Sequence, residues 1–305
     1  MKIQKTLKIA ALALVALAAG GARPAAAKVD VVAANQDLAW VVRAVGGNQV
    51  SVDYLASSNQ DPHLIDPRPS QVVKLARADM AVRIGMDLDL WFDSLIRASG
   101  NSKILPGKSG YVDASRGVKP LEVPQGKLDP SRGDLHVFGN PHYFFGPSNL
   151  IVVAENVKDG LQRVDPSNGS SYQSNFQSLM SRLNDAIKGW KAQLAADRGK
   201  KVVTYHRSLV YFLNNFDLVQ AGNVEPRPGI EPTPGHVARM ASEMKQGGVK
   251  VILTESFRPR RYSDLLARQS GGVVVAIPGG VGAEKGLDDY FKFMDAVVTR
   301  VAAAL

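Results

Sequence analysis

The 305-residue sequence contains no cysteine. Disulfide bonds and thiolate metal ligands are therefore excluded. A folded domain must be stabilised by its hydrophobic core, and any bound metal must be held by histidine and carboxylate side chains. Hydrophobic residues make up 45% of the chain, which is enough for two ordinary globular domains.

Long apolar runs are scarce, and the clearest one lies close to the N-terminus. Three lysines within the first eight residues precede the apolar residues 9–19, and Ala25-Ala26-Ala27 offers a small-residue cleavage site. This pattern predicts a secretory signal peptide over residues 1–27, and an uncleaved anchor is the alternative. Because the chain has no cysteine to carry a lipid, we expect a soluble periplasmic protein without a lipid anchor.

Blocks of lysine and arginine interleaved with aromatic residues are also missing. The formal net charge is +9, but the basic residues are dispersed along the chain. We therefore expect no nucleic-acid partner. The positive charge is typical of a solvated surface, with attraction to an anionic membrane surface or partner as the alternative.

The longest periodic pattern predicts a helix from Ser170 to about Asp197. At 1.5 Å per residue such a helix would be roughly 40 Å long. Ser170 or Ser171 can cap its start, and Arg198-Gly199 is a typical end. Its apolar residues recur every three or four positions and form one stripe: Tyr172, Phe176, Leu179, Leu183, Ile187, Trp190 and Leu194.

Strand and helix patterns alternate on both sides of this helix, which favours parallel sheets covered by helices. The expected strands are residues 28–34, 49–55, 80–84, 201–205, 218–221, 249–254 and 272–277. We predict an α/β fold of two lobes, each a mainly parallel sheet flanked by helices, joined by the long helix. The predicted division is a signal peptide at 1–27, an N-terminal metal-binding lobe at 28–169, a connecting helix at 170–198 and a C-terminal metal-binding lobe at 199–305.

Three of the five histidines occupy places where ligands collect in such folds. His63 lies in the loop after the second strand, His206 follows the strand 201–205 directly, and His142 immediately precedes a helix. Ligands of open α/β sheets gather beyond the carboxyl ends of the strands. A single histidine is more often a surface or hydrogen-bonded residue than a ligand. A cleft between the lobes, however, would bring these three together as a metal site.

Glu255 ends the strand 249–254 in the same way and is a candidate fourth ligand. It could instead cap the next helix or pair with Arg258, Arg260 or Arg261. The sequence is consistent with either role of Glu255, as a metal ligand or as a capping or ion-pairing residue.

The other two histidines are weaker candidates. His136 lies in a glycine-rich loop, either exposed or as an auxiliary metal contact, and His236 at a helix start is structural or solvated. Three imidazoles and one carboxylate suit Zn²⁺ best, because Mn²⁺ and Mg²⁺ prefer more oxygen. The general order of metal affinities for such a site does not by itself exclude copper or nickel.

Four segments together carry a resemblance. They are Asp61-Pro62-His63 followed by Asp66-Pro67-Arg68-Pro69, Gly139-Asn140-Pro141-His142-Tyr143, Val203-Thr204-Tyr205-His206, and Glu225-Pro226-Arg227-Pro228-Gly229-Ile230 leading to Pro234-Gly235-His236. With them the chain resembles, over essentially its whole mature length, the cluster A metal-binding solute-binding proteins of ABC transporters, in particular the zinc-uptake type.

This resemblance implies that His63, His142 and His206 are metal ligands. Manganese-type relatives tend to carry a carboxylate at the third position, so His206 favours zinc. The family fold has two α/β lobes joined by one long helix, which limits hinge closure, so loops are expected to rearrange on metal binding. The implied function is capture of Zn²⁺, with Mn²⁺ or Fe²⁺ less expected, and delivery to an inner-membrane ABC permease. A periplasmic metallochaperone is a further candidate partner, and no enzymatic activity is implied.

The sequence departs from the family pattern in two places. Many members follow the second histidine with Trp and then Asp-Pro, whereas this chain has Tyr143-Phe144-Phe145-Gly146-Pro147. Many members also place an aspartate ligand at the end of the last strand, where this chain has Ala276-Ile277-Pro278. The fourth ligand is therefore expected to be Glu255 or water.

Two alternatives come from other functional classes. A three-histidine zinc with an open position for water is chemically competent for hydrolysis, although the chain lacks a His-Glu-x-x-His helix. An adhesin-like surface role is the second alternative, which the missing lipid anchor disfavours.

Overall fold

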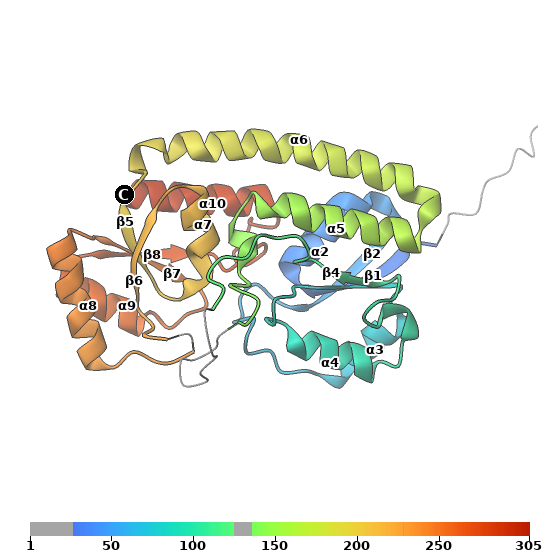
Figure 1. Cartoon of the computed structure of the whole chain (residues 1–305), viewed down its shortest axis with the longest axis horizontal. Coiled ribbons are helices and arrows are strands. Elements are labelled where there is room, and N and C mark those ends of the chain that lie inside the picture. Colours follow the sequence, from blue (N-terminus) through green and yellow to red (C-terminus); the bar gives the residue numbers. More distant parts are fainter. Residues whose placement is uncertain (1–26, 125–135, 228) are drawn as a thin grey trace, which may run out of the picture.

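The computed structural model describes residues 27–124, 136–227 and 229–305. The predicted signal peptide, except Ala27, lies outside these residues. The chain forms two α/β lobes that lie side by side beneath one long helix (Figure 1). This arrangement confirms the predicted fold class.

The first lobe contains a sheet of four parallel strands in the order β2-β1-β3-β4. The central strands β1 and β3 are almost wholly buried, as their valine- and alanine-rich sequences require. Helices α2 and α5 cover one face and α3 and α4 the other (Figure 1). The bounds are β1 (Val29–Asn35), α2 (Gln36–Gly46), β2 (Val50–Ala56), α3 (Pro69–Arg77), β3 (Met80–Arg83), α4 (Leu90–Ala98), β4 (Tyr111–Asp113) and α5 (Asn149–Val164).

The second lobe repeats this arrangement with the strand order β6-β5-β7-β8, again all parallel. Strand β7 is buried along its whole length. The bounds are β5 (Lys201–Thr204), α7 (Val210–Asn215), β6 (Val219–Asn223), α8 (Pro234–Gly247), β7 (Val251–Glu255), α9 (Arg260–Ser270), β8 (Val273–Ile277) and α10 (Tyr290–Ala304).

The long helix α6 (Gly169–Gln193) runs along the top of both lobes (Figure 1). Its predicted apolar stripe packs onto the core, against α2, α5 and α10. The helix starts one residue earlier than predicted, at Gly169, so Ser170 and Ser171 lie inside it and do not cap it. It also ends earlier, at Gln193, and a separate 3-10 turn, Ala195–Asp197, follows.

Short turns and caps border several other helices. After β5 the chain forms a 3-10 turn, Arg207–Leu209, and continues as α7. The closing helix α10 begins at Tyr290 because the side chain of Asp289 accepts hydrogen bonds from the backbone N–H groups of Phe291 and Lys292. The remaining short 3-10 turns are Gly47–Gln49, Ser102–Ile104, Tyr143–Phe145 and Pro166–Asn168.

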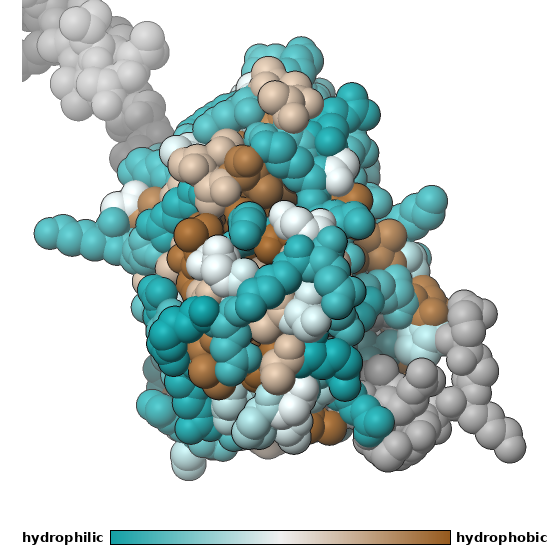
Figure 2. All heavy atoms as spheres, turned by 90° about the vertical axis from the view of Figure 1, so that its left-hand side faces the viewer, coloured by the Kyte–Doolittle hydropathy of each residue, from teal (hydrophilic) through white to brown (hydrophobic). Residues whose placement is uncertain are grey.

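One hydrophobic core runs through both lobes. It joins buried residues of β1, α2 and α5 to those of α6, α7 and α10, and a smaller cluster lies under α8 and α9. The outer end of the second lobe is mostly hydrophilic, with separate apolar spots (Figure 2). Among the described residues no helix combines the length and the apolar content needed to cross a bilayer.

Candidate metal site

The three histidines that were predicted to converge do lie together. His63 is in the loop after β2, His142 is in the segment between β4 and α5, and His206 directly follows β5. One potential ligand atom from each lies within 4.8 Å of the other two. The ring centroids are 5.1 Å apart for His63 and His142, 5.4 Å for His63 and His206, and 5.1 Å for His142 and His206. Nitrogen ligands of a tetrahedral Zn²⁺ lie about 3.4 Å apart, so small side-chain movements would complete such a site.

Two of these histidines are held by the same local structure. In both Asp61-Pro62-His63 and Asn140-Pro141-His142 the first side chain accepts from the backbone and the ring of the histidine. Asp61 Oδ1 lies 3.1 Å from the backbone N of His63 and 2.7 Å from its Nδ1. Asn140 Oδ1 lies 3.0 Å from both the backbone N and the Nδ1 of His142. These are Asx turns, which bond a side chain to the backbone two residues on.

The third histidine takes its partner from another loop. Glu225, which follows β6, places Oε2 2.7 Å from Nδ1 of His206, and both side chains are buried. The carboxylate and amide oxygens at all three histidines are acceptors, so each Nδ1 donates. Each Nε2 therefore keeps its lone pair for another partner. Outer hydrogen bonds of this kind orient metal-binding histidines.

His142 shows the clearest unsatisfied group. Its Nε2 atom is buried and has no hydrogen-bond partner among the described residues. A buried polar atom without a partner costs about 1–3 kcal/mol, which a bound cation would recover. Burial and the neighbouring histidines hold the pKa of His142 well below its usual value, so the ring is neutral and able to bind a metal.

His136 stands next to the three. Its Nε2 lies 3.1 Å from Nε2 of His63. Burial, followed by the charges of His63 and His206, lowers the pKa of His136 to about 4. The ring is therefore neutral near pH 7. Its role as an auxiliary metal contact stays a prediction.

Glu255 lies at the end of β7 and is 1% exposed, but it is not one of the side chains in the three-histidine group. One carboxylate oxygen accepts a hydrogen bond from the Ser208 hydroxyl, and the other has no partner among the described residues. Burial raises the pKa of this carboxyl group. Its assignment as the fourth ligand also stays a prediction.

His236 does not join the cluster. Its Nε2 lies 3.1 Å from the carbonyl oxygen of Asn223, and its Nδ1 lies 2.9 Å from a guanidinium nitrogen of Arg239. These contacts give it a structural role at the start of α8.

Sequence reasoning missed the residues that surround the histidines. Asp61 and Asn140 carried a usable signal, because each stands two positions before its histidine with proline between. Glu225 was noted only as part of the fourth segment of the resemblance, and Arg258 only as a possible partner of Glu255, so neither was expected to contact a histidine or its partner. Arg258 Nη1 lies 2.6 Å from Asp61 Oδ2 and 3.5 Å from Glu225 Oε1. Burial alone would raise the pKa of Asp61, but its hydrogen bond to His63 and the charge of Arg258 lower it well below its usual value.

The cluster opens to solvent on one side. His63 and His136 line an open hollow of about 520 Å³ together with Leu64, Leu90 and Trp91. The side chain of Leu64 is 77% exposed. The indole N–H of Trp91 donates to the carbonyl oxygen of Pro62, 3.3 Å away. This hydrogen bond links Trp91 to the residue before His63.

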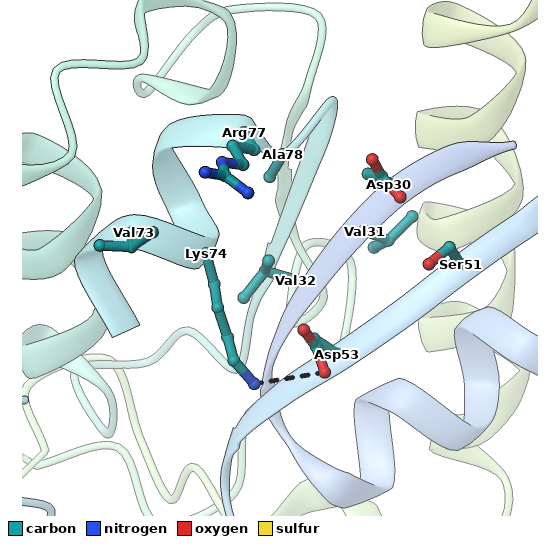
Figure 3. A pocket seen from close by; sticks show the side chains of 9 residues that line it. All are labelled: Asp30, Val31, Val32, Ser51, Asp53, Val73, Lys74, Arg77 and Ala78. Atoms are coloured by element: carbon teal, nitrogen blue, oxygen red, sulfur yellow. Dashed lines mark ion pairs between the residues drawn. The ribbon is translucent and has the colours of Figure 1, made fainter. Parts of the chain in front are cut away.

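A second hollow, of about 220 Å³, lies on the first lobe between α3 and the strands β1 and β2 (Figure 3). Asp30, Asp53, Lys74 and Arg77 are among its lining residues, and Lys74 pairs with Asp53 at 3.3 Å. It contains no histidine. Its charged side chains are exposed and include both signs. Unlike the histidine cluster, it does not bring several metal-binding nitrogen atoms together.

The sequence matches one family of known proteins over most of its length. The family model described as "ZnuA: Zinc-uptake complex component A periplasmic" matches residues 31–304. The metal ABC transporter substrate-binding lipoprotein SloC of Streptococcus mutans is 26% identical over 100% of this chain and 99% of its own length. The zinc-binding protein AdcA of Streptococcus pyogenes is 24% identical over 88% of this chain, which spans only 54% of AdcA. The iron ABC transporter substrate-binding lipoprotein MtsA of Streptococcus pyogenes is 25% identical over 85% of this chain and 82% of its own.

Among solved structures, a crystal structure of ZnuA superimposes with a TM-score of 0.76 at 22% identity, covering 91% of this chain and 99% of that one. This likeness supports the two-lobed fold. SloC and MtsA are named as transporter components rather than enzymes, which supports the prediction that the chain is not an enzyme.

The predicted localisation needs correction. SloC and MtsA are named lipoproteins, which are membrane-attached, and this contradicts the expectation of a soluble periplasmic protein without a lipid anchor. The physical reason is that the absence of cysteine excludes disulfides and thiolate ligands but does not determine the compartment in which a protein works.

The family model covers nearly all of the described chain, and the two-lobed fold agrees with the solved structure of ZnuA. The chain belongs to the ZnuA family, the metal-binding substrate-binding proteins of ABC transporters, which have a membrane permease with its ATPase and a metal ion as partners.

Proposed function

We propose that this protein carries Zn²⁺ and that His63, His142 and His206 bind it through their Nε2 atoms. The main support is that three imidazoles converge on one point while each Nδ1 is held by an outer oxygen. The buried Nε2 of His142, which has no hydrogen-bond partner in the described part of the chain, fits a cation at that point.

The donor set favours zinc over manganese. Imidazole nitrogen suits Zn²⁺, whereas Mn²⁺ prefers carboxylate, carbonyl and water oxygen. AdcA is named for zinc and MtsA for iron, so the family itself leaves the cargo open. In this proposal Glu255 or a water molecule completes the shell, and His136 is an auxiliary contact.

The proposal also includes the domain division and the route of metal loading. The N-terminal metal-binding lobe is residues 28–169, the connecting helix is 170–198, and the C-terminal metal-binding lobe is 199–305. Loading by a metallochaperone is proposed from the resemblance alone.

A competition titration against a chromophoric chelator tests the ligand assignment. We expect His142→Ala and the triple variant H63A/H142A/H206A to lose most of the zinc affinity, and His236→Ala to keep it. Wild-type affinity in the triple variant would show that the ligands were assigned wrongly. Equilibrium dialysis against a mixture of Zn²⁺, Mn²⁺ and Fe²⁺ tests the metal, and preferential uptake of manganese or iron would contradict zinc.

A further inference from the structure

One guanidinium group connects the outer partners of two histidines. Arg258 lies just after β7, and its Nη1 atom contacts Asp61 at 2.6 Å and Glu225 at 3.5 Å. We propose that Arg258 is a positioning residue that holds His63 and His206 in the orientation needed to share one metal ion. This inference rests on the proposed ligand set and adds a residue whose guanidinium binds the carboxylates behind two of the histidines.

Each of the two carboxylates uses one oxygen for a histidine and the other for Arg258. Asp61 accepts from His63 at Oδ1 and contacts Arg258 through Oδ2. Glu225 accepts from His206 at Oε2 and contacts Arg258 through Oε1. The guanidinium therefore fixes the far oxygen of each carboxylate, and rotation of either carboxylate would turn the ring that it holds.

Burial makes these contacts strong. The side chains of Arg258 and Glu225 are 9% and 8% exposed, and that of Asp61 is 16% exposed. Solvent screens such pairs weakly, and removing one partner leaves the other charges buried and unpaired. The guanidinium also lies 5.2 Å from the Phe257 ring centroid and 5.8 Å from that of Tyr205, which limits its movement.

The two carboxylates come from opposite lobes. Asp61 follows β2 in the first lobe, whereas Glu225 and Arg258 belong to loops of the second. Arg258 therefore sets the position of His63 relative to His206 across the boundary between the lobes. A positive charge next to a dication site repels the metal, so its presence there needs a compensating role, and the two carboxylate contacts supply one.

His142 provides an internal contrast. Its outer partner, Asn140, is a neutral amide whose Nδ2 donates to the carbonyl oxygen of Arg207 at 2.8 Å and to Glu122 at 3.0 Å. No guanidinium contact to Asn140 is needed to orient His142. Replacing Arg258 should therefore lower the zinc affinity through His63 and His206. The size of this effect should not depend on Asn140.

The test is zinc affinity, with Co²⁺ absorption as a measure of ligand geometry. We expect Arg258→Met to weaken zinc binding about 10–100-fold, the usual cost of losing outer-shell partners, and to change the Co²⁺ d–d spectrum. Arg258→Lys should restore only part of the affinity, since lysine is shorter than arginine and its ammonium group lacks the rigid planar geometry of the guanidinium. Arg260→Met is the matched control, because Arg260 is exposed in the same segment and pairs with Asp264 at 3.1 Å. It should bind zinc as the wild type does.

A double-mutant cycle separates positioning from general damage. R258M and D61N should combine less than additively, since both act on His63, whereas R258M and N140A should add. Wild-type zinc affinity in R258M, or full additivity with D61N, would overturn the inference. If R258M does not fold, R258Q is measured in its place with the same expected loss and the same overturning result.

His142→Ala is measured in parallel. Loss of zinc by H142A with no effect of the Arg258 variants would reject only the positioning role. Wild-type zinc affinity in H142A would reject the proposed ligand set itself.

Discussion

Asp37 in the first lobe accepts a hydrogen bond from the backbone N–H of Val281 in the second, at 2.7 Å. Ser58 adds a second link, because its hydroxyl donates to the Val281 carbonyl oxygen at 2.8 Å. Val281 belongs to the glycine-rich segment 279–282, which follows β8. This segment is a contact between the lobes, and the contact leads to two predictions.

The first concerns pH. Burial raises the pKa of Asp37 to about 7, although its hydrogen bonds partly oppose this. A carboxyl group that binds its proton more tightly when folded stabilises the protein at low pH. That contribution is lost as pH rises through the folded pKa. We expect the Asp37 contribution to the free energy of unfolding to fall by up to about 1.4 kcal/mol per pH unit between its unfolded and folded pKa values.

Asp37→Asn should remove this dependence while keeping an acceptor for Val281. Urea unfolding of metal-free protein between pH 5 and pH 8 should show D37N gaining stability relative to wild type as pH rises. Asp185→Asn is the control, because Asp185 is exposed and pairs with Lys188 in α6. Wild-type and D37N curves that stay parallel across this range would contradict the prediction.

The second concerns Gly280. A Cβ atom there would lie 2.5 Å from Asp37 Oδ1 and 2.9 Å from the Ser58 hydroxyl, too close for either to stay in place. Gly280→Ala should destabilise the protein by about 1–3 kcal/mol, the usual range for overpacking. Gly235→Ala is the control, because a Cβ at Gly235 meets nothing within 4 Å. Equal thermal unfolding midpoints for the two variants would show that the segment is not tightly docked.

Arg83 at the end of β3 is the basis of a third prediction. It is buried between Asp93, at 2.5 Å, and the fully buried Asp89, at 3.1 Å. Arg83→Met should cost about 3–5 kcal/mol because it leaves two carboxylates in the interior without their cation. Lys103→Met removes an exposed pair with Asp79 and should cost less than about 1 kcal/mol. Chemical denaturation measures both, and a similar cost for the two variants would be the contrary result.

A fourth prediction concerns Glu225, the acceptor for Nδ1 of His206. Glu225→Ala should weaken zinc binding about 10–100-fold, because His206 loses the partner that fixes its tautomer and ring orientation. Glu225→Gln keeps an oxygen acceptor and should lose less. Glu231→Gln, which alters an exposed pair with Arg261, serves as the control. Isothermal titration of zinc compares the three, and an E225A variant with unchanged affinity would oppose this account of His206.

Periodicity was sufficient to predict the fold class. The stripe from Tyr172 to Leu194 identified α6, and the apolar runs identified the strands, because both patterns reflect which face is buried. The ends of α6 were less predictable. They depend on local backbone geometry at Asn168 and Leu194 rather than on the stripe.

The convergence of the histidines was predictable for a different reason. His63 and His206 follow strands of parallel sheets, and parallel strands deliver their carboxyl ends to one edge. Contacts between distant loops were not predictable. The pairing of Arg258 with Asp61 joins residues far apart in sequence, and only the packing of the two lobes brings them together.

The tryptophans are divided between two environments. Trp40 and Trp190 pack on Phe291 in the core under α6, at ring distances of 5.9 Å and 6.3 Å. Trp91 instead shares the wall of the hollow with His63 and bonds the carbonyl group of Pro62. We therefore expect the emission of Trp91 to respond to the position of the His63 loop more than the emission of the two core tryptophans does. Tryptophan fluorescence would then follow metal binding without an added label, and a Trp91→Phe variant provides the blank for such titrations.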